Sequence, residues 1–193
     1  MEERISREDL DIELISEKHR DILESFKTDN TELKQFLIED ALSNQEMGIS
    51  YTYLWFYKKN SELVAYITLL ADAIRVHGTA LGQSFLDKGV DYKTLPALKV
   101  GRLCVHKDYR GYGIGTLTTD FAMKKLLAIN ENEGVGCRFL ITDAKKDAIH
   151  FYKKMHFEIL KEREKGTIPM YYDMIDLLMY KRQAKKGASG AKA

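Results

Sequence analysis

The segment from Arg110 to Gly115 carries three glycines in six residues. It separates an apolar run ending at Val105 from an amphipathic run that begins near Thr116. This order is typical of a strand that turns through glycines into a helix. Such a turn presents bare backbone N–H groups at the positive end of the helix dipole, where they can bind phosphate. Glycine lets a ligand approach the backbone closely and permits a positive φ. The segment therefore predicts a phosphate site.

Three phosphate-binding patterns compete for this segment. A nucleotide P-loop would close with Gly-Lys-Ser/Thr, but Gly115 is followed by Thr116, which excludes it. A dinucleotide fingerprint would space its glycines as G-x-G-x-x-G, whereas these stand at 111, 113 and 115. The third pattern, Arg/Gln-x-x-Gly-x-Gly/Ala, is matched by Arg110, Gly113 and Gly115. A glycine-rich turn without a ligand stays open as the alternative.

A second motif lies downstream, where residues 148–157 read Ala-Ile-His-Phe-Tyr-Lys-Lys-Met-His-Phe. Together the two motifs resemble the GNAT N-acetyltransferase superfamily. Its pyrophosphate segment has the third pattern, and its second signature is Ala-x-x-Phe-Tyr-x-x-x-Gly-Phe. The region from Phe26 to Tyr53, and Asp143 ahead of the second motif, is similar to the toxin-type branch of that family. The resemblance covers roughly residues 10–180.

The resemblance implies acetyl-CoA as cosubstrate, no metal, and an α+β fold with a mixed, mostly antiparallel central sheet flanked by helices. Backbone N–H groups of the glycine segment would bind the pyrophosphate, and the strand before it would pair with the pantetheine arm and polarise the thioester carbonyl. The expected catalytic residue is Tyr152, because a phenol with a pKa of about 10 can protonate the departing thiolate. A packed core tyrosine is the alternative. The expected cofactor-binding residues are Leu103, Cys104, Val105, Arg110, Gly111, Tyr112, Gly113, Ile114, Gly115, Thr116 and Lys145.

No general base is identified. The strand expected at 97–105 has no Asp or Glu, where family members with a carboxylate base often carry one. Asp72 is a secondary candidate, and His106 and His150 can titrate near neutrality. An α-amine, with a pKa of about 8, needs a base less than a lysine at about 10.4, which favours an α-amino acceptor. Two residues depart from the family pattern: His156 replaces the usual glycine, and Lys145 stands where many members have asparagine.

Length and composition predict a single domain over 1–180, followed by a basic, disordered tail at 181–193. Cys104 and Cys137 are expected to be buried, reduced thiols. No apolar run is long enough to span a membrane, and the start Met1-Glu2-Glu3-Arg4 does not resemble a signal peptide. These observations favour a cytoplasmic protein without a membrane or metal partner.

The net charge of +1 conceals two unequal halves. Residues 1–98 carry 11 Lys/Arg against 18 Asp/Glu, whereas residues 99–193 carry 19 against 11. The basic half holds the predicted phosphate site, and positive potential there would favour an anionic cofactor. The leading hypothesis is an N-acetyltransferase that acts on a primary amine of a small molecule, a protein or a peptide. The resemblance to the toxin-type branch suggests aminoacyl-tRNA as another possible acceptor. A homodimer is left open. A non-catalytic acyl-CoA-binding module and a nucleic-acid-binding protein are the alternatives.

Periodicity and turn residues predict the elements. Strands are expected at 11–15, 52–57, 62–74, 97–105 with Pro96 at its start, 138–142, 157–160 and 171–180. A helix capped by Asp29 or Thr31, one at 116–130 and a short one at 147–155 complete the pattern, with an irregular insertion at 75–95.

Overall fold

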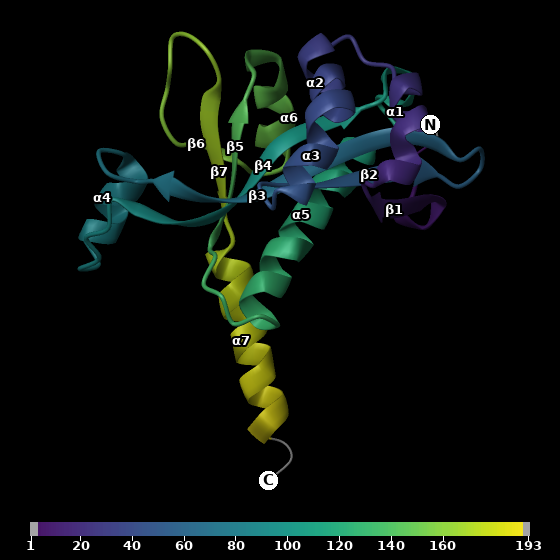
Figure 1. Ribbon diagram of the computed structural model, residues 1–193. Helices are drawn as coiled ribbons and strands as arrows, with labels where there is room; N and C mark the ends of the chain where they lie inside the picture. The colour runs from purple at the N-terminus through teal and green to yellow at the C-terminus, as the bar shows by residue number, and fades with distance from the viewer. Residues whose placement is uncertain (1–3, 191–193) are drawn as a thin grey trace. The chain divides into compact units, whose positions relative to one another are not determined.

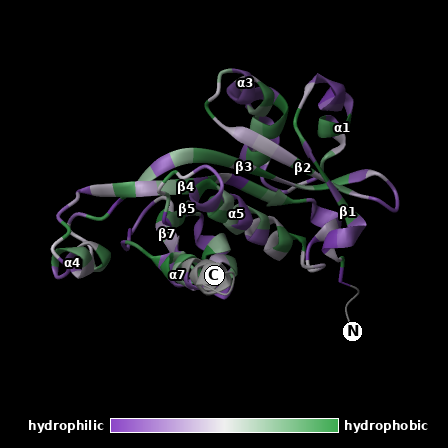
Figure 2. Ribbon diagram, turned by 90° about the horizontal axis from the view of Figure 1, so that it is seen from below, coloured by the Kyte–Doolittle hydropathy of each residue, from purple (hydrophilic) through white to green (hydrophobic). Residues whose placement is uncertain are grey.

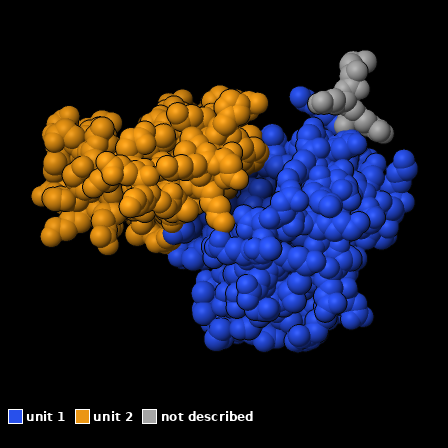
Figure 3. Space-filling model, turned by 90° about the horizontal axis from the view of Figure 1, so that it is seen from above, with its two compact units in different colours: residues 1–71, 99–122 blue, residues 72–98, 123–193 orange. Residues whose placement is uncertain are grey.

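The computed structural model describes residues 4–190, apart from the side chains of 182 and 184–190. Two compact units are distinguished, residues 1–71 with 99–122 and residues 72–98 with 123–193 (Figure 3). The single domain expected over 1–180 stays a prediction. Within the described residues, no helix is long and apolar enough to cross a membrane.

The strands follow the order β1-β2-β3-β4-β5-β7-β6 in one sheet (Figure 1). The pairs β1–β2, β2–β3, β5–β7 and β6–β7 are antiparallel. Helices accompany this sheet, which confirms the α+β class with a mostly antiparallel sheet. The strands are β1 (Leu10–Leu14), β2 (Tyr51–Tyr57), β3 (Glu62–Arg75), β4 (Thr94–Val105), β5 (Phe139–Ala144), β6 (Glu158–Ile159) and β7 (Ile168–Asp173).

The helices of the chain are mostly short. The α-helices are α1 (Arg20–Ser25), α2 (Thr31–Gln35), α3 (Ala41–Glu46), α4 (Ala80–Leu86), α5 (Ile114–Glu131), α6 (Ile149–Lys154) and α7 (Ile175–Gly190). The 3-10 turns are η1 (Arg7–Asp9), η2 (Glu17–His19), η4 (Lys107–Tyr109) and η5 (Lys146–Ala148), and η3 (Phe36–Asp40) is a π-helical turn. Figure 2 shows that the long helix α5 carries both hydrophobic and hydrophilic residues, as the sequence predicted for this amphipathic segment.

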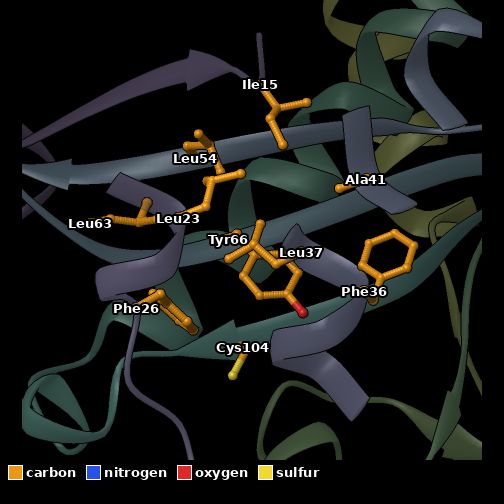
Figure 4. Close-up of a cluster of buried hydrophobic side chains, with 10 residues drawn as sticks. All are labelled: Ile15, Leu23, Phe26, Phe36, Leu37, Ala41, Leu54, Leu63, Tyr66 and Cys104. Atoms are coloured by element: carbon orange, nitrogen blue, oxygen red, sulfur yellow. The ribbon is translucent and has the colours of Figure 1, made fainter. Parts of the chain in front are cut away.

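In the first unit, α2, η3 and α3 form one helical segment over residues 31–46. Its cap is Asn30, whose Oδ1 accepts from the backbone N–H of Leu33 at 3.2 Å, so the predicted caps Asp29 and Thr31 are wrong. At the π turn the backbone N–H of Ala41 donates to the carbonyl of Phe36 five residues back. The core under this segment contains aromatic and aliphatic side chains of both helices and strands (Figure 4). It consists of Ile15, Leu23, Phe26, Phe36, Leu37, Ala41, Leu54, Leu63, Tyr66 and Cys104.

The β2–β3 hairpin buries one polar pair. Thr52 and Thr68 lie opposite each other, and their hydroxyl oxygens are 2.8 Å apart at 0% and 2% exposure. We expect Thr52→Val to lower the free energy of unfolding by about 1–3 kcal/mol, because it leaves the Thr68 hydroxyl buried without its partner. The double variant Thr52→Val/Thr68→Val should recover most of that loss. Urea denaturation of the wild type, the two single variants and the double variant measures the coupling between the two hydroxyls. If the loss in the double variant equals the sum of the losses in the single variants, the coupling is contradicted.

In the second unit, the strand predicted at 171–180 is wrong beyond Asp173. The Asp173 carboxylate accepts from the backbone N–H of Ile175 at 3.0 Å and so caps α7. Met174 and Leu178, four residues apart, are both buried, which is the spacing of a helix face. The helix runs to residue 190, so the predicted tail begins inside α7. That the tail is disordered stays a prediction. Residues 191–193 of that tail lie outside the described residues.

Other element boundaries differ by a few residues from those expected. β4 begins at Thr94, so Pro96 lies inside the strand instead of starting it. α5 begins at Ile114 and not at Thr116, which places the end of the glycine segment in the first helical turn. The insertion at 75–95 contains α4, capped by the Thr79 hydroxyl on the N–H of Gly82. Both cysteines are buried and free, as predicted, although Cys137 precedes its strand.

Candidate active site

The glycine segment joins β4 to α5 through two residues of left-handed backbone. Gly111 has φ +89° and Gly113 has φ +87°, values that residues with a side chain rarely adopt. A Cβ added at either position would meet nothing within 4 Å, so conformation and not crowding requires glycine here. Because α5 starts at Ile114, the N–H groups of Ile114, Gly115 and Thr116 have no acceptor in the preceding turn. The structure confirms the strand, turn and helix arrangement that suits an anion.

The start of this segment is held by the chain before α2. The Arg110 Nη1 donates to the Asp29 carboxylate at 2.8 Å. Nearby, the backbone N–H of Lys107 donates to the carbonyl of Lys27 at 2.9 Å. The Cys104 thiol donates to the Thr28 hydroxyl at 3.3 Å. Residues 27–29 therefore form a strap beside the glycine segment, which we call the phosphate loop after its predicted ligand, and Arg110 already has one anionic partner in this strap.

The side chains of Cys104 and Val105, at the end of β4, pack in buried clusters. Cys104 is 5% exposed and belongs to the core of the first unit, where burial raises the pKa of its thiol. Val105 packs on a second buried cluster that contains Trp55 and Ile114. Leu103 is partly buried. A cofactor would therefore meet the main chain of Leu103–Val105, as the sequence predicted; this contact stays a prediction.

Tyr112 contributes its backbone to the loop while its ring packs elsewhere. Its carbonyl accepts from the N–H of Ile5 at 3.1 Å, and its ring lies 6.3 Å from that of Tyr109. Both rings line a surface pocket of about 310 Å³ together with Ile5, Tyr57, Lys59, Glu62 and Asp108. The Tyr112 ring and carbonyl therefore hold the glycine segment against Tyr109 and Ile5.

In the second unit, Tyr152 is fixed by aromatic neighbours on α6 and after it. Its ring centroid lies 5.1 Å from that of Phe151 and 5.2 Å from that of Phe157, and the residue is 6% exposed. Burial raises the pKa of Tyr152, and a hydrogen bond with the Thr142 side chain opposes this rise. The phenol therefore keeps its proton at neutral pH, the state that a proton donor needs.

The end of α6 explains one departure from the family pattern. The N–H of Phe157 donates to the Tyr152 carbonyl at 3.0 Å, and the N–H of His156 donates to the Lys153 carbonyl at 3.0 Å. These two bonds, with the contact of Phe157 on Tyr152, are those of a Schellman motif. His156 occupies its left-handed position with φ +62°, where glycine is favoured. The Schellman motif fixes the backbone of Tyr152, and His156 takes the position in this motif that has a positive φ.

We expect His156→Gly to raise the free energy of unfolding by about 1 kcal/mol, because glycine adopts the left-handed conformation without a Cβ clash. The matched control is His150→Gly on the exposed face of α6, which should lower stability because glycine is a poor helix former. Thermal unfolding of both variants gives the comparison. A loss of stability at both positions would show that the side chain of His156 matters more than its backbone.

The remaining residues that the sequence analysis named as candidates differ in exposure and in hydrogen bonding. Lys145 is exposed and precedes η5, where its carbonyl accepts from the N–H of Ala148 at 2.9 Å. The Asp72 carboxylate accepts from the N–H of Ala73, and His150 is exposed. His106 is 8% exposed, and burial lowers its pKa. No group of three or more His, Cys, Asp or Glu among the described residues is placed to hold a metal ion.

Sequence reasoning missed the strap and Thr142. The sequence around Asp29 predicts a helix cap, and nothing in this local pattern indicates a partner 81 residues away. Thr142 could have been suspected only from its place on the strand before the tyrosine helix.

Comparison with known proteins adds a family and a fold. A family model described as an acetyltransferase (GNAT) domain matches residues 50–159. Among solved structures, AtaT complexed with acetyl-methionyl-tRNAfMet aligns with a TM-score of 0.75 and 20% identity, over 89% of this chain and 99% of that one. A tyrosine-to-phenylalanine mutant of KacT aligns with a TM-score of 0.76 and 21% identity, also over 89% and 99%. AtaTR bound with acetyl-CoA aligns with a TM-score of 0.67 and 19% identity, over 90% and 98%. At these identities the likeness to solved structures shows the fold alone.

Proposed function

Because the chain belongs to the GNAT acetyltransferase family, we propose that it transfers the acetyl group of acetyl-CoA to a primary amine. The observation that carries the proposal is the turn between β4 and α5, with left-handed backbone at Gly111 and Gly113 and space above both. N–H groups at a helix start, approached through such a turn, suit a pyrophosphate. The fold likeness to AtaTR, a structure bound with acetyl-CoA, supports this ligand.

The residues proposed to hold acetyl-CoA are those expected from the sequence. The N–H groups of residues 111–116 would bind the pyrophosphate, with Arg110 adding positive charge, and the backbone of Leu103–Val105 would take the pantetheine arm. Lys145 stays a proposed cofactor contact on the same ground. The thioester of acetyl-CoA supplies the acetyl group. Since the loop contributes main chain, it orients the cofactor without strong demands on side-chain identity.

Tyr152 is proposed to move the proton that the reaction requires. Acyl transfer to an amine releases a thiolate, and the Tyr152 hydroxyl would donate its proton to that sulfur. The raised pKa of Tyr152 keeps the donor protonated, and the contacts with Phe151 and Phe157 hold its ring in place. The solved structures with a similar fold include variants of AtaT and KacT in which a tyrosine is replaced by phenylalanine. The same substitution at Tyr152 tests its proposed role in this chain.

We propose the α-amino group of an aminoacyl-tRNA as the acceptor. Support comes from the fold likeness to AtaT, which was solved with acetyl-methionyl-tRNAfMet. Residues 99–193 carry 19 Lys/Arg against 11 Asp/Glu, which favours a polyanionic acceptor. β4 carries no carboxylate, and an α-amine, with a pKa of about 8, needs a base less than a lysine side chain at about 10.4. Such an acceptor would place the reaction in the cytoplasm.

The proposal is tested with labelled acetyl-CoA and methionyl-tRNA. We expect label on the charged tRNA, none on uncharged tRNA, and a rise in Tm of the protein with acetyl-CoA alone. A rise in Tm without label on any charged tRNA or amine panel would favour the non-catalytic acyl-CoA-binding module. Label on simple amines but on no charged tRNA would retain the acetyltransferase and remove the tRNA acceptor.

A further inference from the structure

Arg102 stands on β4 immediately before Leu103–Val105. Strand side chains alternate between faces, so Arg102 shares its face with Val100 and Cys104. Cys104 belongs to the core under helical residues 31–46, and the guanidinium carbon of Arg102 lies 5.0 Å from the ring centre of Phe36. Arg102 is thus a partly buried cation under the first residue of the π turn η3.

The guanidinium is incompletely satisfied. Its Nη1 donates to the carbonyl of Gly101 at 2.8 Å, while its Nε is buried and has no hydrogen-bond acceptor. Within residues 4–190, no carboxylate is seen in an ion pair with Arg102, unlike Arg110, which pairs with Asp29, and Arg138, which pairs with Asp173. A half-buried charge with an orphan donor is costly, so such a group calls for an explanation.

A ligand oxyanion would supply both the counter-charge that the guanidinium lacks and a hydrogen-bond acceptor. The planar guanidinium presents donors in a fork that matches phosphate or carboxylate oxygens, and the Phe36 ring holds its plane. Val105 lies three residues further, about 10 Å along the strand, and the phosphate loop follows it. The loop has its own arginine at Arg110. An anion at Arg102 is therefore separate from the one at the loop.

We propose that Arg102 binds an oxyanion of the acceptor, a backbone phosphate when the acceptor is aminoacyl-tRNA. This inference rests on the proposed function, because the acceptor is the one proposed there, and it places one oxyanion of that acceptor beside the Arg102 guanidinium. The π turn above it agrees with this assignment, since π turns occur frequently at functional sites. Arg102 would then position the acceptor, while the chemistry is left to other groups.

The kinetic test compares Arg102→Gln and Arg102→Lys with the wild-type chain on two acceptors. For methionyl-tRNA we expect Arg102→Gln to raise KM at least tenfold with kcat within twofold, and Arg102→Lys to restore part of the affinity. For methioninamide, which has no anionic group, KM should stay unchanged. Arg20→Gln, which removes an exposed arginine of the same unit, is the matched control for general loss of positive charge. Equal losses on both acceptors, or a loss in Arg20→Gln as large, would overturn the proposal.

A second readout does not depend on activity. The Nε–H resonance of Arg102, assigned by its absence in Arg102→Lys, should shift and saturate as inorganic phosphate is added, but not with chloride at equal ionic strength. Acetate in place of phosphate tells a carboxylate-bearing acceptor from a phosphate-bearing one. If wild type labels no charged tRNA, the acceptor proposal fails while a phosphate or acetate shift still supports an anion site. No shift with either anion overturns the inference.

Discussion

Replacing Tyr152 with phenylalanine should lower kcat for acetyl transfer about 100-fold and leave the Kd for acetyl-CoA within twofold. A positioned general acid contributes a factor of about 10² to 10⁴, and phenylalanine removes only the hydroxyl. The ring contacts with Phe151 and Phe157 remain in the variant, so packing is preserved. Initial-rate kinetics at saturating acceptor give kcat, and calorimetric titration gives the Kd.

The matched control is Tyr171→Phe. Tyr171 is also buried, and its hydroxyl donates to the Glu158 carboxylate at 2.6 Å, so it serves as a buried tyrosine without a proposed role in the reaction. It should keep wild-type kcat despite losing a hydrogen bond. If Tyr152→Phe also kept wild-type kcat, the tyrosine would be a core residue only.

The pH profile follows from the direction of the Tyr152 shift. Because burial raises its pKa above the ordinary value of about 10, the phenol stays protonated throughout the neutral range. The rate should therefore rise with pH as the acceptor amine loses its proton, near pH 8 for an α-amine, and show no alkaline fall below about pH 10. A fall between pH 7 and 9 would identify a different acid.

Replacing Gly113 with valine should weaken acetyl-CoA binding at least about tenfold, a change of about 1.4 kcal/mol. A β-branched residue at φ +87° costs about 1–2 kcal/mol in the present conformation, and relief of that strain requires the loop to move. The N–H groups at the start of α5 would then no longer converge on one anion. Calorimetric titration with acetyl-CoA measures the loss.

Gly48→Val provides the comparison for Gly113→Val. Gly48 has φ +70° and open space for a Cβ, like Gly113, but it follows α3 and is not part of the phosphate loop. Both variants should lose similar stability in urea denaturation, and only Gly113→Val should lose affinity. Equal affinity in the two would mean that the loop backbone does not bind the cofactor.

The parts of this protein that the sequence predicted well are those with a local cause. Alternating apolar residues and turn residues located the β2–β3 hairpin, and the glycines located the turn before α5. The helix at 175–190 was missed because aromatic Tyr171 and Tyr172 suggested a longer strand, while the stop signal was a single Asp173 cap.

The features that escaped prediction depend on residues far apart in the chain. Asp29 looks like a helix cap until its ion pair with Arg110 is seen. Arg102 carries no sequence signal, because its peculiarity is a missing partner and not a motif. The sequence shows that His156 replaces a glycine of the family pattern, but only the backbone shows that it adopts the left-handed conformation typical of glycine.

The strap at residues 27–29 also bears on the order in which contacts can form while the protein is being synthesised. Its hydrogen bonds to Cys104 and Arg110 join residues 76 and 81 positions apart, and closing such long segments slows folding. Both partners have been synthesised once the chain reaches residue 110, well before Tyr152 exists. The glycine segment can therefore gain its hydrogen bonds to the strap on a growing chain before Tyr152 has been added.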